Sequence, residues 1–284
     1  ILTLLGAKIC GREADDTVVK HGCVVEYIHA ATLLHDDVVD ETTVRRGKET
    51  VNAKWGSDAS ILVGDFLISR AILILAQDCE RKIIQAVTEA TKILVEGGIH
   101  EYTEARNMKV TEKHILDVIH RKTGSMISVS ARLGGLLANA TEQQETAIIS
   151  FGDDFGMAFQ LMDDALDYDS DEAVLGKPPG TDFKEGHVTL PLHHLYSKAD
   201  RYLKKELEAF VKNESITEKD LQYVVEHMHK HKSIDYTVNL ARFYIDRAKS
   251  HLRKADFPAP QYIEHFDAVA DYIHSRHTAT TVTP

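Results

Sequence analysis

Several residue types that mark other protein classes are scarce in this chain. Six prolines among 284 residues are few, and no linker rich in Gly, Ser or Pro divides the chain. We therefore expect a single domain over residues 1–284, although this length would allow two domains. The three cysteines, Cys10, Cys23 and Cys79, are odd in number and lack the spacing of metal pairs. Their pattern favours a reducing compartment and a cytoplasmic location.

Positive charge and long apolar runs are also scarce. The formal net charge is −11, and no Lys/Arg run occurs, so we expect no nucleic-acid partner and no basic membrane patch. No apolar run is expected to span a bilayer. Ile1 begins inside an apolar helical pattern without an initiator Met, so we expect a further N-terminal segment before it. Residues 278–284 are expected to form a disordered tail.

Apolar residues recur at three- and four-residue steps nearly throughout, as they do in amphipathic helices. The pattern is clear at 17–35 and 61–75, and no convincing period-two strand is found. Thr141 precedes a helical run, and Gln144 completes a capping box with it. The sequence thus predicts an all-α bundle. The stretch 168–190 is rich in Gly, Pro and charge, and so long a loop is expected to be a functional lid.

The sharpest feature is an acidic motif that closes an apolar helical run. It reads His35-Asp36-Asp37-Val38-Val39-Asp40. Asp36 and Asp40 share one face of a helix because they are four residues apart. Carboxylates packed this closely repel one another and need a compensating cation. Hard oxygen ligands without a nearby Cys favour magnesium, which also binds phosphate oxygens.

The acidic motif is repeated at residues 162–167, which read Met-Asp-Asp-Ala-Leu-Asp and again end an apolar helix. Asp163 and Asp167 again lie one turn apart. A single Asp-rich helix end is generally a solvated surface. Two such ends in one bundle predict a site in which the motifs face each other and hold several magnesium ions around one diphosphate.

Two basic segments accompany these motifs. Arg45 and Arg46 follow the first motif, and guanidinium groups bind phosphate oxygens bidentately. Lys122 and Thr123 interrupt another helical pattern, where Gly124 allows a kink. Taken alone, the first segment is equally an ordinary basic loop, and the second is equally a surface helix break. Their place beside the acidic motifs favours a diphosphate site.

These motifs make the chain resemble the trans-isoprenyl diphosphate synthases over essentially its whole length. The segments that carry the resemblance are 34–40, 45–47, 63–65, 122–123, 159–164, 180–183 and 189–191. The amino-acid sequence of residues 24–70 is most similar to that of bacterial octaprenyl-type synthases. The resemblance implies a single-domain isoprenoid synthase bundle of α-helices around a central cavity, usually present as a homodimer.

The resemblance also implies roles for individual residues. It implies that about three magnesium ions bind, two at the first motif and one at the second. The carboxylates expected to hold these ions are Asp36, Asp37, Asp40, Asp163, Asp164 and Asp167. The residues expected to contact the allylic diphosphate are Arg45, Lys122, Thr123, Gln160, Lys177 and His187. The residues expected to contact isopentenyl diphosphate are His29 and Arg46. Of these, the ones expected to be catalytic are Asp36, Asp37, Asp40, Arg45, Lys122, Asp163 and Asp164.

The implied reaction condenses isopentenyl diphosphate with an allylic prenyl diphosphate to give an all-trans polyprenyl diphosphate. Membrane association is expected to be at most peripheral, for product release. Ile28, Ala31 and Thr32 are expected to define the chain-length cavity, with Ile68 and Ile72 in its deeper wall. Because Ala31 and Thr32 are small, the growing tail is expected to pass them. One isoprene unit is about as long as one helical turn of 5.4 Å. We therefore expect a product of about thirty to forty carbons, which would serve as a quinone side chain.

The sequence departs from the family pattern at three places. A Gly-Lys-x-x-Arg-Pro segment is expected before Ile1. His187 stands where the family usually has Lys, and Gly-Glu-x-x-Gln is replaced by 97–101, with Gly98 and Glu101 at the two changed positions. The alternatives are a shorter-chain farnesyl or geranylgeranyl diphosphate synthase, a class I terpene cyclase and a non-catalytic regulatory subunit. The two Asp motifs and the Arg pair favour a synthase with two diphosphate substrates.

Overall fold

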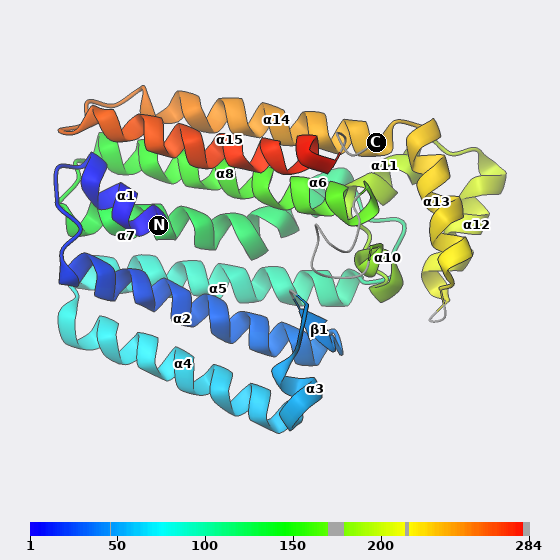
Figure 1. Ribbon diagram of the computed structural model, residues 1–284, viewed down its shortest axis with the longest axis horizontal. Coiled ribbons are helices and arrows are strands. Elements are labelled where there is room, and N and C mark those ends of the chain that lie inside the picture. Colours follow the sequence, from blue (N-terminus) through cyan, green and yellow to red (C-terminus); the bar gives the residue numbers. More distant parts are fainter. Residues whose placement is uncertain (46, 170–178, 214–215, 281–284) are drawn as a thin grey trace.

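The structure is a computed structural model that describes residues 1–45, 47–169, 179–213 and 216–280. Over these residues the chain is a bundle of long helices that run side by side (Figure 1). The only strands among them are Val44–Arg45 (β1) and Lys48–Glu49 (β2), which pair antiparallel. The all-α fold class that the sequence predicts is therefore confirmed.

The helices differ greatly in length, and the longest form the bundle. In chain order they are α1 (Leu2–Ile9), α2 (Asp16–Val39), α3 (Val51–Trp55), α4 (Ser57–Asp78), α5 (Arg81–Glu104), α6 (Glu112–Ile119), the π-helix η1 (His120–Gly124), α7 (Ser125–Leu137), α8 (Glu142–Asp169), α10 (Thr181–Glu185), α11 (Leu190–Lys198), α12 (Arg201–Lys212), α13 (Glu218–Lys230), α14 (Ser233–Leu252), the 3-10 helix η2 (Pro260–Tyr262) and α15 (Ile263–Thr280).

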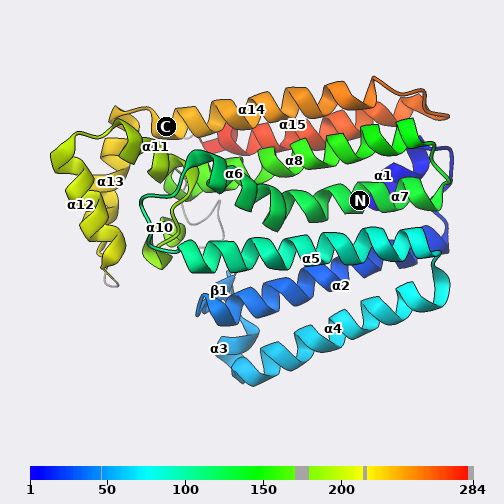
Figure 2. The same cartoon turned by 180° about the vertical axis from the view of Figure 1, so that it is seen from behind.

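Helix α8 lies at the centre of the bundle. α14 and α7 pack along it, α5 lies beside α7, and α4 forms the outer edge against α2, as Figures 1 and 2 show from opposite sides. Fully buried Phe151, Leu161 and Leu166 of α8 anchor the larger core. Helices α2, α5 and α8 all end at the same end of the bundle, to the right in Figure 1. This common end brings together side chains that are far apart in the sequence.

The helix boundaries follow from local capping. The Thr141–Gln144 capping box is confirmed at the start of α8, because the Gln144 backbone N–H donates to Thr141 Oγ1 at 3.3 Å and Thr141 N–H donates to Gln144 Oε1 at 2.9 Å. At α2, the Val18 N–H donates to Asp15 Oδ1 at 2.9 Å. The expected break at Gly124 is a turn of π-helix. The short β1–β2 hairpin was not expected, and Gly47 helps to close it with a φ of 71°.

Two expectations need correction. The sequence predicts no segment able to span a bilayer, yet among the described residues α4 is long and apolar enough to do so by length and composition. Its mean hydropathy reaches 2.0 in a window that is only 28% buried. Apolar residues on all its faces, rather than one uninterrupted run, produce this value. At the other end, α15 continues to Thr280, into the expected tail, and residues 281–284 lie outside the described part.

Candidate active site

The first acidic motif ends α2 as expected. The helix closes at Val39, and the N–H of Asp40 donates to the Asp36 carbonyl at 2.8 Å. This backbone bond stacks Asp36 and Asp40 one turn apart, both half-buried. In the second motif, the last turns of α8 carry half-buried Asp163 and buried Asp164. Both motifs therefore lie where the sequence places them.

Asp37 is oriented differently from the two carboxylates beside it. It is only 4% exposed, and its Oδ1 accepts a hydrogen bond at 2.7 Å from Nε of Arg45 on β1. We expected Asp37 to help hold magnesium and Arg45 to bind the allylic diphosphate. The observed contact shows that Asp37 fixes the guanidinium of Arg45, and its role at magnesium stays a prediction.

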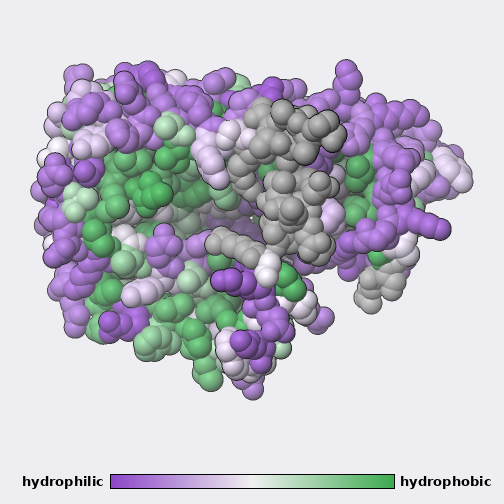
Figure 3. Space-filling view, viewed as in Figure 1, coloured by the Kyte–Doolittle hydropathy of each residue, from purple (hydrophilic) through white to green (hydrophobic). Residues whose placement is uncertain are grey.

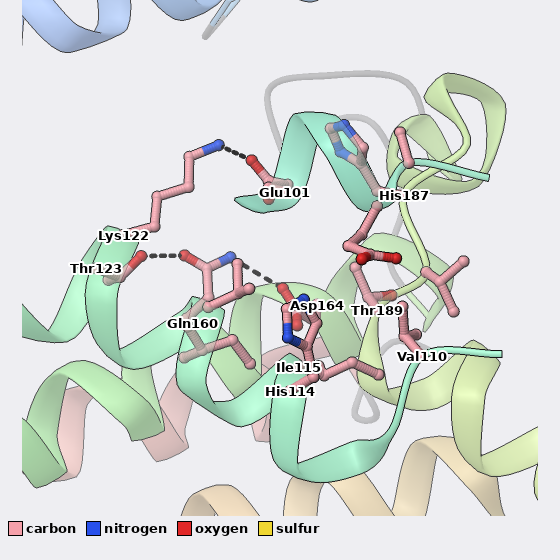
Figure 4. Close-up of a pocket in the computed structure, with 15 residues that line it drawn as sticks. Glu101, Val110, His114, Ile115, Lys122, Thr123, Gln160, Asp164, His187 and Thr189 are labelled. Carbon is pink, nitrogen blue, oxygen red and sulfur yellow. Dashed lines mark hydrogen bonds and ion pairs between the residues drawn. The ribbon is translucent and has the colours of Figure 1, made fainter. Parts of the chain in front are cut away.

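A hydrogen-bond chain links the π-helix to the second motif. Thr123 Oγ1 donates to Gln160 Oε1 at 2.7 Å, and Gln160 Nε2 donates to Asp164 Oδ1 at 2.9 Å. Figure 4 shows these three side chains in line on one wall of the pocket. The sequence placed Thr123 and Gln160 in the site, and the structure brings them together.

Glycines on two neighbouring helices allow the π-helix to approach closely. A Cβ on Gly97 of α5 would lie 2.8 Å from the backbone nitrogen of Lys122. A Cβ on Gly156 of α8 would lie 2.5 Å from the Cα atom of Gly124. Each distance is shorter than real Cβ contacts allow, so only glycine fits. These two contacts hold Lys122 and Thr123 between α5 and α8.

Lys122 has a carboxylate partner that we did not anticipate. Its Nζ donates to Glu101 Oε2, and the two side chains are 28% and 29% exposed. Glu101 is one of the two changed positions in 97–101, and its side chain lies on the pocket wall with Lys122 (Figure 4). The other changed position, Gly98, faces open space.

The carboxylates of both motifs are desolvated, which perturbs their ionisation. Burial raises the pKa of Asp36 and of Asp40, and Lys122 opposes this rise. Burial also raises the pKa of Asp164 well above its usual range, and Asp182 adds to the effect. Glu101 raises the pKa of the carboxyls in both motifs. Both motifs therefore lie within electrostatic range of the same carboxylate.

The third carboxylate of the second motif has a structural contact. Asp167 is fully buried, its Oδ2 accepts the N–H of Asp182 at 3.1 Å, and its carbonyl accepts the N–H of Gly180 at 2.7 Å. These bonds fix the segment that leads to His187. His187 lies on the pocket wall, with its Nδ1 3.9 Å from Glu185 Oε2. Asp167 thus anchors this segment to α8, and its expected role at a metal stays a prediction.

The motif at 63–65 supports the first acidic motif from α4. A Cβ on Gly64 would lie 2.3 Å from the His35 ring, so the glycine makes room for that ring between the two helices. His35 Nε2 lies 3.3 Å from the Ile61 carbonyl and 3.6 Å from Asp65 Oδ1. This packing holds the residue that directly precedes Asp36.

Several expected site residues, among them Asp36, Asp40 and Asp163, are not part of the lining of the described pocket. His29 is exposed on α2. Ile28 and Ala31 are buried, Thr32 is half-buried, and none of the three lines the described pocket. Ile72, expected in the deeper wall, is 55% exposed. Arg46 and Lys177 lie outside the described residues.

The pocket has an apolar wall opposite its polar residues. It has a volume of about 110 Å³, and Val110, Ile115, Val118 and Ile119 of the α6 segment line it. The periodicity of the sequence indicates a helix there, but it does not indicate that this helix would face the acidic motifs. The pocket therefore combines oxygen ligands with apolar surface.

The carboxylates fit a hard divalent cation. Asp36 and Asp40 on α2 and Asp163 and Asp164 on α8 supply only oxygen ligands, and burial disfavours the charged form of three of them. A bound cation would offset this cost, and such ligand sets are typical of magnesium. We therefore regard these four carboxylates as the candidate metal ligands.

Residues 1–228 match the polyprenyl synthetase family. The chain is 37% identical to the octaprenyl diphosphate synthase of Haemophilus influenzae, over 85% of this chain and 73% of that protein. It is 40% identical to the Escherichia coli octaprenyl diphosphate synthase, over 68% of this chain and 60% of that protein. The geranylgeranyl diphosphate synthase of Methanosarcina mazei is 32% identical, over 92% of this chain and 79% of that protein.

Solved structures share the fold. A polyprenyl synthase from Caulobacter crescentus, complexed with calcium and isoprenyl diphosphate, superposes with a TM-score of 0.91 and 33% identity. The match covers 96% of this chain and 83% of that one. The agreement extends over the bundle that carries both acidic motifs.

Proposed function

Because the chain belongs to the polyprenyl synthetase family and is a prenyltransferase of that family, we propose that it elongates an allylic prenyl diphosphate with isopentenyl diphosphate to a long all-trans polyprenyl diphosphate. The observation that carries this proposal is the pair of acidic motifs that end α2 and α8. Glu101 raises the pKa of Asp36 in the first motif and of Asp164 in the second, and Asp164 lines one pocket together with Glu101 and Lys122. A pocket of this kind suits a diphosphate with its cations.

In the proposed reaction, this chain's own residues bind and orient the allylic diphosphate. Lys122 and the Arg45 guanidinium supply donors to phosphate oxygens. The Thr123 hydroxyl donates its hydrogen to Gln160 in the structure, so its proposed contact with a phosphate oxygen requires that this hydrogen bond be exchanged. Magnesium held by the Asp36, Asp40, Asp163 and Asp164 carboxylates would supply stabilisation of the charge on the departing diphosphate. His29 and Arg46 remain the proposed contacts of isopentenyl diphosphate.

The bonds balance without a further co-reactant. The C1–O bond of the allylic diphosphate breaks, and its electron pair leaves with the diphosphate. The double bond of isopentenyl diphosphate then attacks C1, and a proton lost from the adjacent carbon restores a double bond. The departing diphosphate is the nearest base. The apolar residues of the α6 segment exclude water from the cation.

Chain length is the finer part of the proposal. We propose about thirty to forty carbons, since Ala31 and Thr32 are small side chains below Asp36 and each helical turn of 5.4 Å admits about one isoprene unit. Similarity to octaprenyl diphosphate synthases supports this length, and similarity to a geranylgeranyl diphosphate synthase supports a shorter one. The mass of the product distinguishes them.

We further propose a homodimer that associates through α4. Leu62, Phe66 and Leu73 recur at helical spacing and are 68%, 62% and 43% exposed; Figure 3 shows apolar surface along this helix, at its lower edge. A second copy suits this face better than a bilayer, because α4 packs against α2 and carries Asp65 and Arg70 in its middle. A cytoplasmic location with at most peripheral membrane association remains part of the proposal.

The test is incorporation of labelled isopentenyl diphosphate by the purified protein alone. With magnesium and farnesyl or geranylgeranyl diphosphate as primer, we expect a ladder of polyprenyl diphosphates that mass spectrometry resolves. Failure to incorporate label with any allylic primer contradicts a synthase and favours a regulatory subunit. A cyclic hydrocarbon formed without isopentenyl diphosphate favours a terpene cyclase.

A further inference from the structure

The Glu101–Lys122 pair joins two elements that also form a second, parallel ion pair. Glu96 and Glu101 lie on α5, and they bind the adjacent cations Arg121 and Lys122 of the π-helix. The Glu96 Oε2 to Arg121 Nη1 distance is 3.2 Å. Only the Glu101–Lys122 pair lies on the pocket wall. The chain therefore supplies its own comparison between a pair at the site and one outside it.

Lys122 is the cation that acts on the first acidic motif, and it lines the pocket together with Asp164 of the second motif. It lowers the pKa of Asp36 and Asp40, so its charge reaches the first motif. Burial alone would lower the pKa of Lys122, but Glu101 and then Asp36 more than reverse this, so its pKa lies above the ordinary value. Lys122 is thus a fixed positive charge, and Glu101 is the carboxylate in direct contact with it.

This contact has a consequence for an incoming diphosphate. Without metal, the carboxylates of Asp36, Asp40 and Asp164 all lie within electrostatic range of Glu101, and Glu101 is already bound to the Lys122 ammonium. A diphosphate must then displace a carboxylate from Lys122 and approach the others without a compensating charge. Positive charge held by the motifs gives Glu101 a second counter-charge, which lowers the cost of releasing Lys122.

We propose that Glu101 is a positioning residue that holds Lys122 in the metal-free protein and yields it to diphosphate once cations occupy the acidic motifs, so that diphosphate binding depends on metal. This inference rests on the proposed function and concerns the same site. A purely structural role, in which Glu101 only neutralises a partly buried lysine, would affect folding stability and leave the metal dependence of binding unchanged.

The experiment is a titration of inorganic diphosphate, followed by calorimetry, into wild type, Glu101→Gln and Glu96→Gln. Each protein is measured in EDTA and in excess magnesium. Glu101→Gln keeps the side-chain shape and removes the charge. We expect it to bind metal-free diphosphate about tenfold more tightly than wild type, because Lys122 is no longer neutralised. In magnesium its Kd should change by less than about threefold.

Glu96→Gln is the matched control, since it weakens the neighbouring pair on the same two elements. Its Kd should stay within about twofold of wild type under both conditions. Thermal melting of all three proteins reports whether a variant is destabilised. Should Glu101→Gln fail to fold, Glu101→Ala, which also removes the charge, should show the same tightening in EDTA.

Two results would overturn the inference. One is a Glu101→Gln protein whose metal-free Kd equals that of wild type. The other is an equal change of Kd in EDTA and in magnesium, which would mean that Glu101 does not link binding to metal. A wild-type protein that binds no diphosphate in magnesium would contradict the proposed function itself, and the inference with it. Wild-type binding in magnesium therefore separates the two failures.

Discussion

Asp37 accepts a 2.7 Å hydrogen bond from Arg45 Nε, between the end of α2 and the strand that follows it. The Asp37 side chain is 6% exposed, whereas that of Arg45 is 37% exposed. The carboxylate is thus a buried support for a partly exposed cation that also lowers the pKa of Asp36 and Asp40. In the proposed reaction, Asp37 would act on diphosphate through Arg45.

The first prediction concerns this support. Asp37→Asn should raise the KM for the allylic diphosphate about tenfold and leave kcat within about threefold, because Arg45 loses its fixed orientation while the metal-binding carboxylates remain. Stability should fall by roughly 1–2 kcal/mol. Steady-state kinetics of Asp37→Asn, Arg45→Ala and the double variant check this. Fully additive effects of the two changes would contradict a shared role.

The second prediction concerns metal-free stability. Burial raises the folded-state pKa of Asp36 above its unfolded value, so the folded protein holds that proton more tightly. The ionised carboxylate therefore destabilises the fold at pH above its folded pKa, and this penalty disappears as the pH falls through that value toward the unfolded pKa. In EDTA at about pH 7.5, Asp36→Asn should raise the melting temperature, and the gain should vanish near pH 4.

A control of opposite sign is available at the start of α13. The capping contact with Thr217 lowers the pKa of Asp220, so its ionised form stabilises the fold above the unfolded pKa. Asp220→Asn should lower the melting temperature at neutral pH, and this loss should shrink as the pH falls through the folded pKa. Identical pH profiles for the two variants would contradict the account of Asp36.

The third prediction concerns chain length. Thr32 is half-buried, and its hydroxyl donates to the His29 carbonyl of its own helix at 2.9 Å, so an aromatic ring there can extend into space beside α2. Thr32→Phe should shorten the product to about fifteen or twenty carbons while first-step turnover persists, at about one isoprene unit per 5.4 Å turn. Mass spectrometry of the products measures this.

Ala31 provides the comparison for that experiment. It is fully buried, so Ala31→Phe should also shorten the product but should overpack the core by about 1–3 kcal/mol. A Thr32→Phe protein of normal stability that still makes wild-type products would remove α2 from any role in setting chain length. Loss of stability and rate with unaltered product length would mean that these positions serve only packing.

The fourth prediction concerns the proposed dimer. Phe66 is 62% exposed on α4, so Phe66→Glu places a charge on the proposed contact between copies and should convert a dimer to monomer. Tyr202, 74% exposed on α12, is the matched control, and Tyr202→Glu should leave the assembly intact. Light scattering on eluted protein measures both masses. A monomeric wild type, or a dimeric Phe66→Glu, would contradict association through α4.

Much of the fold follows from the sequence because its signals are local. Three- and four-residue periodicity identifies the long helices, and the Thr141–Gln144 box marks the start of α8. The four-residue spacing of Asp36 and Asp40 places both on one turn. The two-residue strands of the hairpin are too short to show a period, and the π-helix differs from an α-helix by a single extra residue in one turn.

What could not be predicted depends on which face of a helix meets which neighbour. Ile72 was expected in a cavity wall and is exposed, since periodicity does not tell which side of α4 is covered. The pairing of Asp37 with Arg45 requires the hairpin that the sequence does not reveal. Glu101 was recognised only as a change from the family pattern, because its partner is 21 residues away on another element.

The central claim is that the two acidic motifs form one site, and one comparison of variants tests this claim most directly. Asp36→Ala and Asp163→Ala each remove a carboxylate from a different helix, and the purified proteins are assayed for isopentenyl incorporation in magnesium alongside a melting curve. We predict that each change lowers turnover at least about a hundredfold while the protein stays folded. A double variant that is folded and retains more than a few per cent of wild-type turnover would contradict the two-motif site.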